Sequence, residues 1–161
     1  MKYIKAAVEL FIVMMLLLPL TAEEAKSQSR DSNFGLGVVV GEPTGIAGKL
    51  WVNDLNAFAG TAAWSFQGHT TLHLHLDYLH HNYDHINVNR GSMAFYYGLG
   101  GRLLARGENR DDRFGIRIPF GLAYFFSDDP VEIFLELAPI LDVVPTTEFT
   151  GNSGLGVRYY F

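Results

Sequence analysis

The amino-acid sequence predicts an all-β protein, an eight-stranded antiparallel up-and-down transmembrane β-barrel. Three observations lead to this fold class. Large apolar residues alternate with small or polar ones at period two in eight segments, and no later segment shows convincing helical periodicity. The 161-residue chain contains 17 glycines and 14% aromatic residues, a pairing typical of compact β-proteins with tight turns. The first segment has the properties of an export signal.

Residues 1–25 are predicted to be a secretory signal peptide. Two lysines lie among the first five residues, the run LFIVMMLLL is unbroken and apolar, and small residues follow it near the expected cleavage point. The apolar run is too short for a transmembrane helix, which needs about 20 residues. A retained N-terminal anchor helix is the alternative. Residues 26–33 then form a polar leader, and residues 34–161 form the outer-membrane barrel domain.

Composition excludes several classes of function. The chain carries 12 Lys+Arg against 17 Asp+Glu, a formal charge of -5, which gives no reason to expect nucleic acid as a partner. The sequence contains no cysteine. Disulfides, thiol catalysis, cysteine metal sites and an acylated lipoprotein anchor are therefore excluded.

The alternating segments are predicted strands of about ten residues, the length that a tilted strand needs to cross a bilayer. The eight segments are 34–41, 45–52, 57–66, 71–81, 93–104, 113–124, 131–138 and 154–161. An even number of strands suits an up-and-down barrel, because closure removes the edges. Pro119 removes a hydrogen-bond donor within the sixth segment, so we expect a local bulge there.

The composition of the two strand faces indicates which face is inside. One face is large and apolar, whereas the other is mostly Gly and Ala with isolated charged residues. A few long charged side chains among small ones suit the narrow lumen of an eight-stranded barrel, so the apolar face is expected to meet lipid. The charged residues should then form a hydrogen-bonded network inside. This predicted lumen network comprises Lys49, His73, His75, Asp77, Arg102, Arg117, Glu132, Glu136 and Arg158.

The stretch TLHLHLDYLHH contains four of the six histidines. His73, His75 and Asp77 occupy alternate positions, which places them together on the inward face. We expect Asp77 to pair with Arg102 or Lys49 in a polar lumen network. The alternative is a metal site at His73 and His75, which would need ligands from other strands.

Strand ends are expected to mark the membrane interfaces. His80 and His81 fall at a strand end and are expected on such an interface. Aromatic residues near strand ends would form interfacial girdles. The candidates are Trp64, Phe66, Tyr124, Phe125 and Tyr159.

Five stretches carry a resemblance to known proteins. They are GLGVVVGEPTGIAGKLW (35–51), LHLHLDYL (72–79), FYYGLGGRL (95–103), RIPFGLAYFF (117–126) and GVRYYF (156–161). In size and signal the chain resembles the small eight-stranded outer-membrane barrels of Gram-negative bacteria, the OmpA and OmpX type. More closely, it resembles an uncharacterised outer-membrane barrel domain family named after a spirochaete surface protein.

The resemblance implies an outer-membrane protein of a Gram-negative-type bacterium, exported through a cleaved signal peptide. Its expected partners are outer-membrane lipid and the barrel-insertion machinery, and it is expected to be a monomer without a cofactor. Val157, Tyr159 and Phe161 resemble the C-terminal signal that the insertion machinery reads. The resemblance implies no activity for any residue.

The expected lengths of the connections on the two sides of the membrane are unusual. With both ends of the barrel domain periplasmic, the connections 42–44, 67–70, 105–112 and 142–152 would face outward. The long connection 82–91 would lie on the periplasmic side, whereas small outer-membrane barrels usually have their longer loops outside.

A non-enzymatic integral barrel with a structural or surface-interaction role is the favoured function, and no catalytic, cofactor-binding or metal-binding residue is predicted. A narrow porin-like channel is one alternative. A second is a barrel enzyme acting on lipid A or phospholipid, with His69 near Ser65 and with Asp77 and Asp111 as orienting groups. A third is a soluble lipocalin-like binder in the periplasm, with the apolar face inside.

Overall fold

The computed structural model describes residues 32–65, 71–84, 86–106 and 111–161. The predicted signal peptide and residues 26–31 of the leader lie outside the described residues. Among the residues described, no helix is long and apolar enough to cross a membrane.

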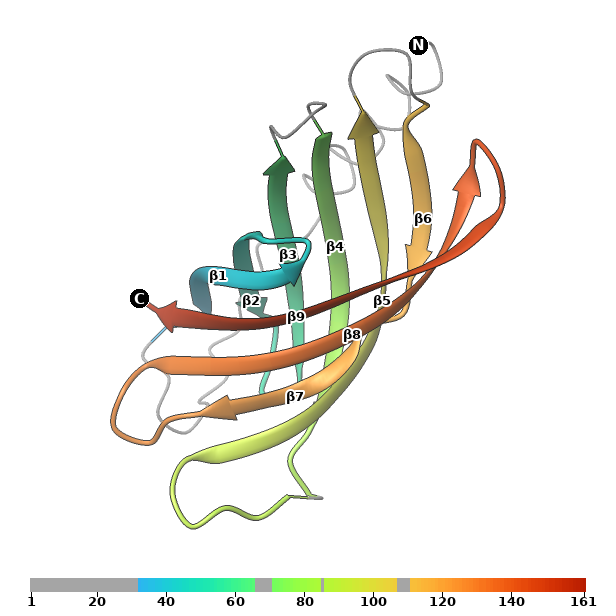
Figure 1. The fold of residues 1–161 in the computed structure, drawn as a ribbon. Coiled ribbons are helices and arrows are strands. Elements are labelled where there is room, and N and C mark those ends of the chain that lie inside the picture. The colour runs from blue at the N-terminus through green and yellow to red at the C-terminus, as the bar shows by residue number, and fades with distance from the viewer. Residues whose placement is uncertain (1–31, 66–70, 85, 107–110) are drawn as a thin grey trace.

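All regular elements of the described chain are β-strands (Figure 1). They are β1 (Phe34–Glu42), β2 (Gly45–Trp51), β3 (Asn56–Ser65), β4 (Thr71–Asn82), β5 (Ser92–Arg106), β6 (Arg113–Arg117), β7 (Phe120–Phe125), β8 (Val131–Val144) and β9 (Glu148–Tyr160). The alternation of large apolar with small or polar residues explains these strands, because successive side chains of a strand point to opposite faces.

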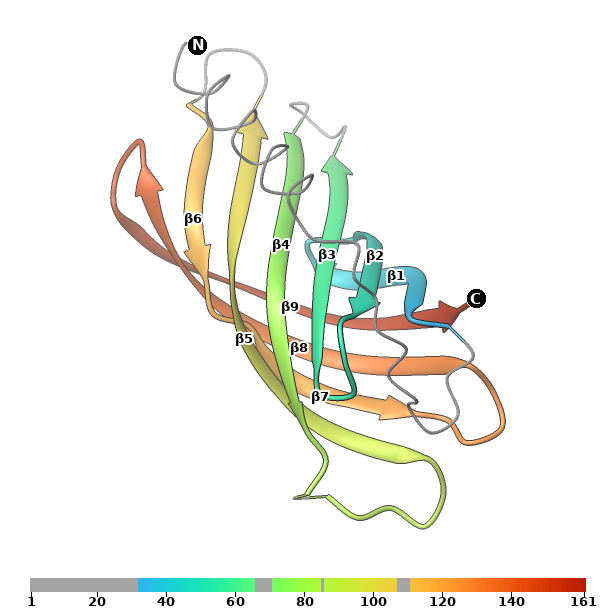
Figure 2. The ribbon, with the colours of Figure 1, turned by 180° about the vertical axis from the view of Figure 1, so that it is seen from behind.

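The strands close into a single antiparallel ring. Each strand from β1 to β5 pairs with the next, β8 pairs with β9, and β9 returns to β1. Both β6 and β7 pair with β5 on one side and β8 on the other, so together they form one strand of the wall. The result is an eight-stranded up-and-down barrel, which confirms the predicted fold class (Figures 1 and 2).

The interruption between β6 and β7 lies at Ile118 and Pro119. Arg117 pairs with Gly100 of β5, and Phe120 pairs with Tyr97 of the same strand. The two pairs are separated by three residues on each strand, so neither strand has an extra residue between them. The register is therefore continuous, and the bulge expected at Pro119 is wrong. Pro119 has no N–H to donate, but its carbonyl still accepts from Gly98 N at 2.8 Å. The register shift in this region lies between Phe114 and Gly115 instead.

The inward and outward faces follow the alternation. Inward positions are buried and often hold alanine, as at Ala47, Ala57, Ala94 and Ala123, each 0% exposed. Outward positions hold large apolar side chains that are about half exposed throughout the ring, such as Val40 at 66%. Small inward residues leave room for a few long polar side chains in a barrel of this width.

Three expectations about strand ends need correction. β8 and β9 run through most of the expected 142–152 connection, which is reduced to residues 145–147. Phe125 was expected in an interfacial girdle and His81 at a membrane interface. Both instead point inward, with exposures of 6% and 0%. Trp64 and Tyr159 point outward, whereas Phe66 lies outside the described residues.

The wall is lower at β1 and β2 than elsewhere. β1 pairs with β9 only as far as Ser153, so no described strand pairs with that side of β9 between residues 148 and 152. β2 pairs with β3 only as far as Ala62. Both views show the short β1–β2 hairpin beside the taller β3 and β4 (Figures 1 and 2). We call this gap in strand pairing above the β1–β2 turn the side notch.

Candidate functional site

The polar residues of the interior form three ion-pair clusters. Each cluster is named after a residue at its centre: the Glu132 cluster, the Arg117 cluster and the Asp142 cluster. All three are built from inward positions of strands that are distant in sequence. A buried charge is tolerable only when it is paired and hydrogen-bonded, so these contacts decide how the lumen is filled.

The Glu132 cluster holds one carboxylate between two cations. Lys49 Nζ donates to Glu132 Oε1 at 2.7 Å, and Arg158 Nη1 donates to the same oxygen at 3.2 Å. The Tyr160 hydroxyl donates to Oε2 at 2.5 Å. Glu132 is 0% exposed. Its carboxylate is therefore saturated by donors from β2 and β9.

Aromatic side chains enclose the Glu132 cluster. Lys49 Nζ lies 4.6 Å from the ring centroid of Trp51, and Trp51 Nε1 donates to the Tyr160 hydroxyl at 3.0 Å. The rings of Trp51 and His81 have centroids 4.4 Å apart, and those of Trp51 and Phe125 are 5.9 Å apart. Cations over aromatic faces gain electrostatic stabilisation, so these rings compensate in part for the lost water.

The Arg117 cluster holds two carboxylates on one guanidinium. Arg117 Nε donates to Asp77 Oδ2 at 2.9 Å, and Arg117 Nη2 donates to Glu136 Oε1. Arg117 Nη1 donates to Asn152 Oδ1 at 3.2 Å. Tyr96 supplies a further donor through its hydroxyl, which lies 3.0 Å from Glu136 Oε2. Arg117 and Asp77 are each 1% exposed.

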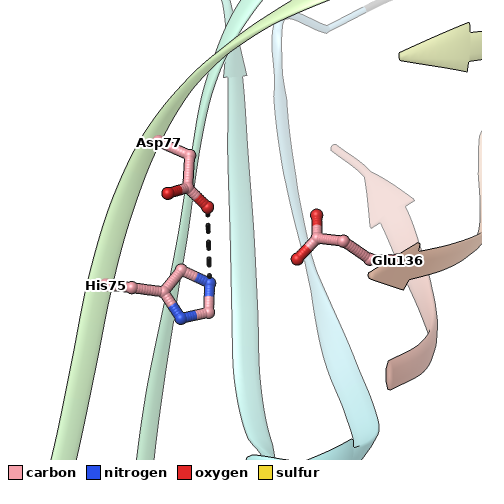
Figure 3. Close-up of side chains that lie close together, drawn as sticks. All are labelled: His75, Asp77 and Glu136. Carbon is pink, nitrogen blue, oxygen red and sulfur yellow. Dashed lines mark ion pairs between the residues drawn. The ribbon is translucent and has the colours of Figure 1, made fainter. Parts of the chain in front are cut away.

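His75 adds an imidazole to the Arg117 cluster. Its Nε2 lies 3.8 Å from Asp77 Oδ2, and ligand atoms of His75, Asp77 and Glu136 all lie within 4.8 Å of one another. Figure 3 shows the three side chains converging from β4 and β8. His73 lies one inward position away, with a ring centroid 5.7 Å from that of His75.

The Asp142 cluster lies where β5, β6, β8 and β9 approach the end of the barrel that carries the β8–β9 turn. Arg102 Nη2 donates to both oxygens of Asp142, at 2.5 and 2.6 Å, and to Thr150 Oγ1 at 3.1 Å. Arg113 Nη1 bridges from Asp142, at 3.5 Å, to Glu148, at 2.7 Å. Arg102 and Asp142 are buried, whereas Arg113 and Glu148 are partly exposed. The cluster therefore extends from the interior to the solvent at this end of the barrel.

A small cavity borders the Arg117 cluster. It measures about 10 Å³, which is room for one water molecule. Its lining includes His75, Arg117 and Glu136 on the inner side and the β1–β2 turn residues Glu42 and Pro43 at the rim. The cavity therefore lies beside the side notch.

All nine residues of the predicted lumen network lie on the inward face, and eight are buried, with Glu136 half-buried. The expected partner of Asp77 is wrong: it is Arg117 rather than Arg102 or Lys49. Sequence reasoning missed Asp142, which is 0% exposed and pairs with Arg102. Alternation continues past residue 138 and could have identified it. When Asp142 is included, the predicted network has equal numbers of cationic and acidic side chains. The four cations are Lys49, Arg102, Arg117 and Arg158, and the four carboxylates are Asp77, Glu132, Glu136 and Asp142.

The residues of the enzyme alternative are not brought together among the described residues. His69 lies outside the described residues, as does the Ser65 side chain. Asp77 is bound to Arg117, and Asp111 is exposed in a connection. The expected insertion signal, Val157, Tyr159 and Phe161, points outward, with exposures of 41%, 48% and 68%. Its reading by an insertion machinery stays a prediction.

Comparison with known proteins gives the fold and the family. The N-terminal β-barrel domain of Pseudomonas aeruginosa OprF matches with a TM-score of 0.54 and 16% identity, over 80% of this chain and 95% of that one. At this identity the likeness concerns the fold. No curated protein matches the chain. Residues 25–161 match a protein family, so the chain, an eight-stranded β-barrel, belongs to the family described as "Protein of unknown function (DUF3996)".

Proposed function

We propose that the chain is a non-enzymatic integral barrel of a bacterial outer membrane, with a structural or surface-interaction role and an interior filled by its own side chains. The single observation that carries this proposal is the outward face. Along the described strands, no outward position holds Asp, Glu, Lys or Arg except Glu42 at the end of β1. A face this large and apolar in water would be an aggregation hazard, whereas in lipid it is the stable arrangement.

The closed ring supports the same proposal. In hydrocarbon every backbone N–H and C=O must be satisfied within the protein, and closed barrels are one of two structures that achieve this. The pairing from β1 round to β9 and back supplies these bonds along the paired lengths of the strands, and the side notch is the exception. The soluble periplasmic alternative would need the apolar face inside, and the burial pattern is the reverse.

The paired interior supports a non-enzymatic role. A catalytic acid or base must be free to meet a substrate, whereas the carboxylates of the three clusters are each engaged by cationic donors. Lipid A composition in cells carrying His69→Ala should therefore match that of wild type. A changed acyl pattern would restore the enzyme alternative.

The partners follow from the outward face. We infer that membrane lipid surrounds the barrel, that an insertion machinery reads Val157, Tyr159 and Phe161, that the chain is exported through a cleaved signal peptide, and that it works as a monomer. The apolar outward face supports the contact with lipid, and the outward position of the three C-terminal side chains supports their reading by an insertion machinery. Export and the monomeric state rest on the resemblance of the sequence to small outer-membrane barrels.

The first test is gel mobility of the protein from an outer-membrane fraction, with and without boiling. A closed barrel with an internal ion-pair network resists SDS, so the unboiled protein should migrate differently from the boiled one. Recovery in the soluble periplasmic fraction with no mobility difference would contradict the proposal.

A narrow channel is the second candidate function. Inside the lumen, Arg117 and Arg102 each pair with a carboxylate two strands away along the wall, and such contacts would act as a plug. In planar bilayers the double variant Arg117→Ala with Arg102→Ala should then conduct more than wild type. Equal single-channel conductance would mean that these ion pairs do not control passage.

A further inference from the structure

We propose that Asn56, His80 and Tyr97, on the outward face of the barrel, bind the headgroup of a phospholipid that ends in an ammonium with N–H donors, such as phosphatidylethanolamine. We call these three residues the polar row. The inference rests on the proposed function, because it requires the outward face to meet lipid. It deepens that function by naming the class of lipid that one part of the face selects.

The polar row crosses three neighbouring strands beside the β2–β3 turn. Asn56 pairs with His80 in the β3–β4 register, and His80 pairs with Tyr97 in the β4–β5 register. Side chains at directly paired positions lie on the same face and within contact distance. The ring centroids of His80 and Tyr97 are 5.5 Å apart, and Tyr97 is 51% exposed. Both views show β3, β4 and β5 side by side (Figures 1 and 2).

Hydrogen bonds in the β2–β3 turn fix the proton on the His80 ring. The backbone N–H groups of Leu55 and Asn56 donate to Asn53 Oδ1, at 3.0 and 2.8 Å, so this atom is an acceptor. The Asn56 side chain therefore turns its Nδ2 to the same oxygen, at 3.0 Å, and its Oδ1 toward His80 Nδ1, at 2.9 Å. An amide oxygen only accepts, so His80 Nδ1 carries the hydrogen.

The fixed proton leaves His80 with an acceptor on its other nitrogen. In a neutral imidazole with hydrogen on Nδ1, Nε2 is a bare lone pair. Among the residues that the structure describes, none donates to His80 Nε2. An acyl chain cannot donate a hydrogen bond, and an ionised phosphate only accepts. An ammonium with N–H groups supplies the missing donor, and the neighbouring Tyr97 ring can take part of its positive charge.

The charges at this end of the barrel also favour a cation. The described connections that share the end with the β2–β3 turn carry four exposed acids and one exposed base. The acids are Asp54, Asp84, Asp128 and Asp129, and the base is Arg90. An acidic rim attracts an ammonium and repels a headgroup of net negative charge. The sign of the charge therefore agrees with the hydrogen-bonding requirement of the polar row.

The outward residues next to the polar row suit the rest of a phospholipid. One outward position further from the turn, Phe58 and Tyr78 form an edge-to-face pair with ring centroids 5.1 Å apart. At the next outward position, Gly60 pairs with Leu76. Polar, aromatic and aliphatic rows thus follow one another along β3 and β4. This is the order in which a lipid presents its headgroup, its interfacial region and its acyl chains.

The test is native mass spectrometry of the full-length protein in detergent, titrated with phospholipids that share the same acyl chains and differ in the headgroup. The series runs from phosphatidylethanolamine through its N-methyl and N,N-dimethyl forms to phosphatidylcholine, which has no N–H. A single acceptor needs a single donor, so the first three should bind alike. Phosphatidylcholine should bind about threefold to tenfold more weakly, the factor expected for one hydrogen bond.

Two variants test the role of the His80 ring. His80→Phe keeps an aromatic ring and removes the acceptor, so phosphatidylethanolamine and phosphatidylcholine should bind equally. Asn56→Leu keeps His80 but removes the acceptor that holds the hydrogen on Nδ1, so the preference should fall here too. Tyr159→Phe is the matched control, because it changes another outward aromatic residue, on β9, and should leave the preference unchanged.

Heat-dependent gel mobility shows which variants fold and tests the proposed function separately. A folded outer-membrane barrel that binds phosphatidylethanolamine and phosphatidylcholine equally would overturn this inference and leave the proposed function intact. Three other results would also overturn it: a preference that survives in His80→Phe, an equal loss in Tyr159→Phe, or tighter binding of phosphatidylglycerol than of phosphatidylethanolamine. The last result would mean that the row binds phosphate rather than an ammonium.

Discussion

In the described part of the chain, Glu132 is the one carboxylate that neutralises both Lys49 and Arg158 in the interior. Its carboxylate accepts from Lys49, Arg158 and Tyr160. Glu132→Gln leaves two buried cations without an anion, and removing one partner of a buried pair costs about 3–5 kcal/mol. We expect that loss in the free energy of unfolding in urea, measured in detergent micelles. Glu42→Gln, at an exposed strand end, is the control and should unfold like wild type.

For single residues, the sequence predicts the direction of a side chain but not its partner. Alternation placed Asp77 and Arg117 on the inward face, because side-chain direction has a period of two residues. It could not pair them, since they lie on β4 and β6, with β5 between, and contact across the lumen depends on strand tilt and stagger. Asp142 is missed for another reason: the predicted segment ends at residue 138, whereas β8 continues through Pro139 to Val144.

At the scale of elements, the short β1–β2 hairpin determines where the interior can be reached. Asn152 points inward beside the notch and lines the cavity, whereas Ala94 on β5 is 0% exposed. The chain has no cysteine, so single cysteines can be introduced without background. A small cationic methanethiosulfonate should modify Asn152→Cys in intact vesicles much faster than Ala94→Cys. Equal rates at the two sites would mean that the notch gives no access.

The elements themselves were largely predictable. The eight predicted segments correspond to the eight strands of the wall, because large apolar residues occupy every second position. Two boundaries differ: β8 continues to Val144 rather than ending at residue 138, and β9 begins at Glu148 rather than at residue 154. Pro119 divides one wall strand into β6 and β7 without a bulge, and Pro139 continues β8 on its outward side. Neither outcome could be read from propensity alone, because neighbouring strands decide which donors are needed.

For the whole molecule, the proposed function requires the large apolar face of the sheet to lie outside and the charged residues to lie inside. The chain contains two tryptophans, and they lie on opposite faces. Trp64 is 52% exposed on the outward face of β3, whereas Trp51 is 6% exposed inside β2. Fluorescence of each tryptophan alone therefore reports one face of the barrel.

The two single-tryptophan variants, Trp51→Phe and Trp64→Phe, should be reconstituted in vesicles whose lipids carry bromine on their acyl chains. Bromine quenches by contact, so the fluorescence of Trp64 in Trp51→Phe should fall strongly and that of Trp51 in Trp64→Phe should change little. Phenylalanine keeps an aromatic ring at both positions, and gel mobility confirms that each variant folds. If the fluorescence of Trp51 were quenched and that of Trp64 were not, the apolar face would lie inside the barrel. A soluble binder with an apolar cavity would then become the favoured hypothesis.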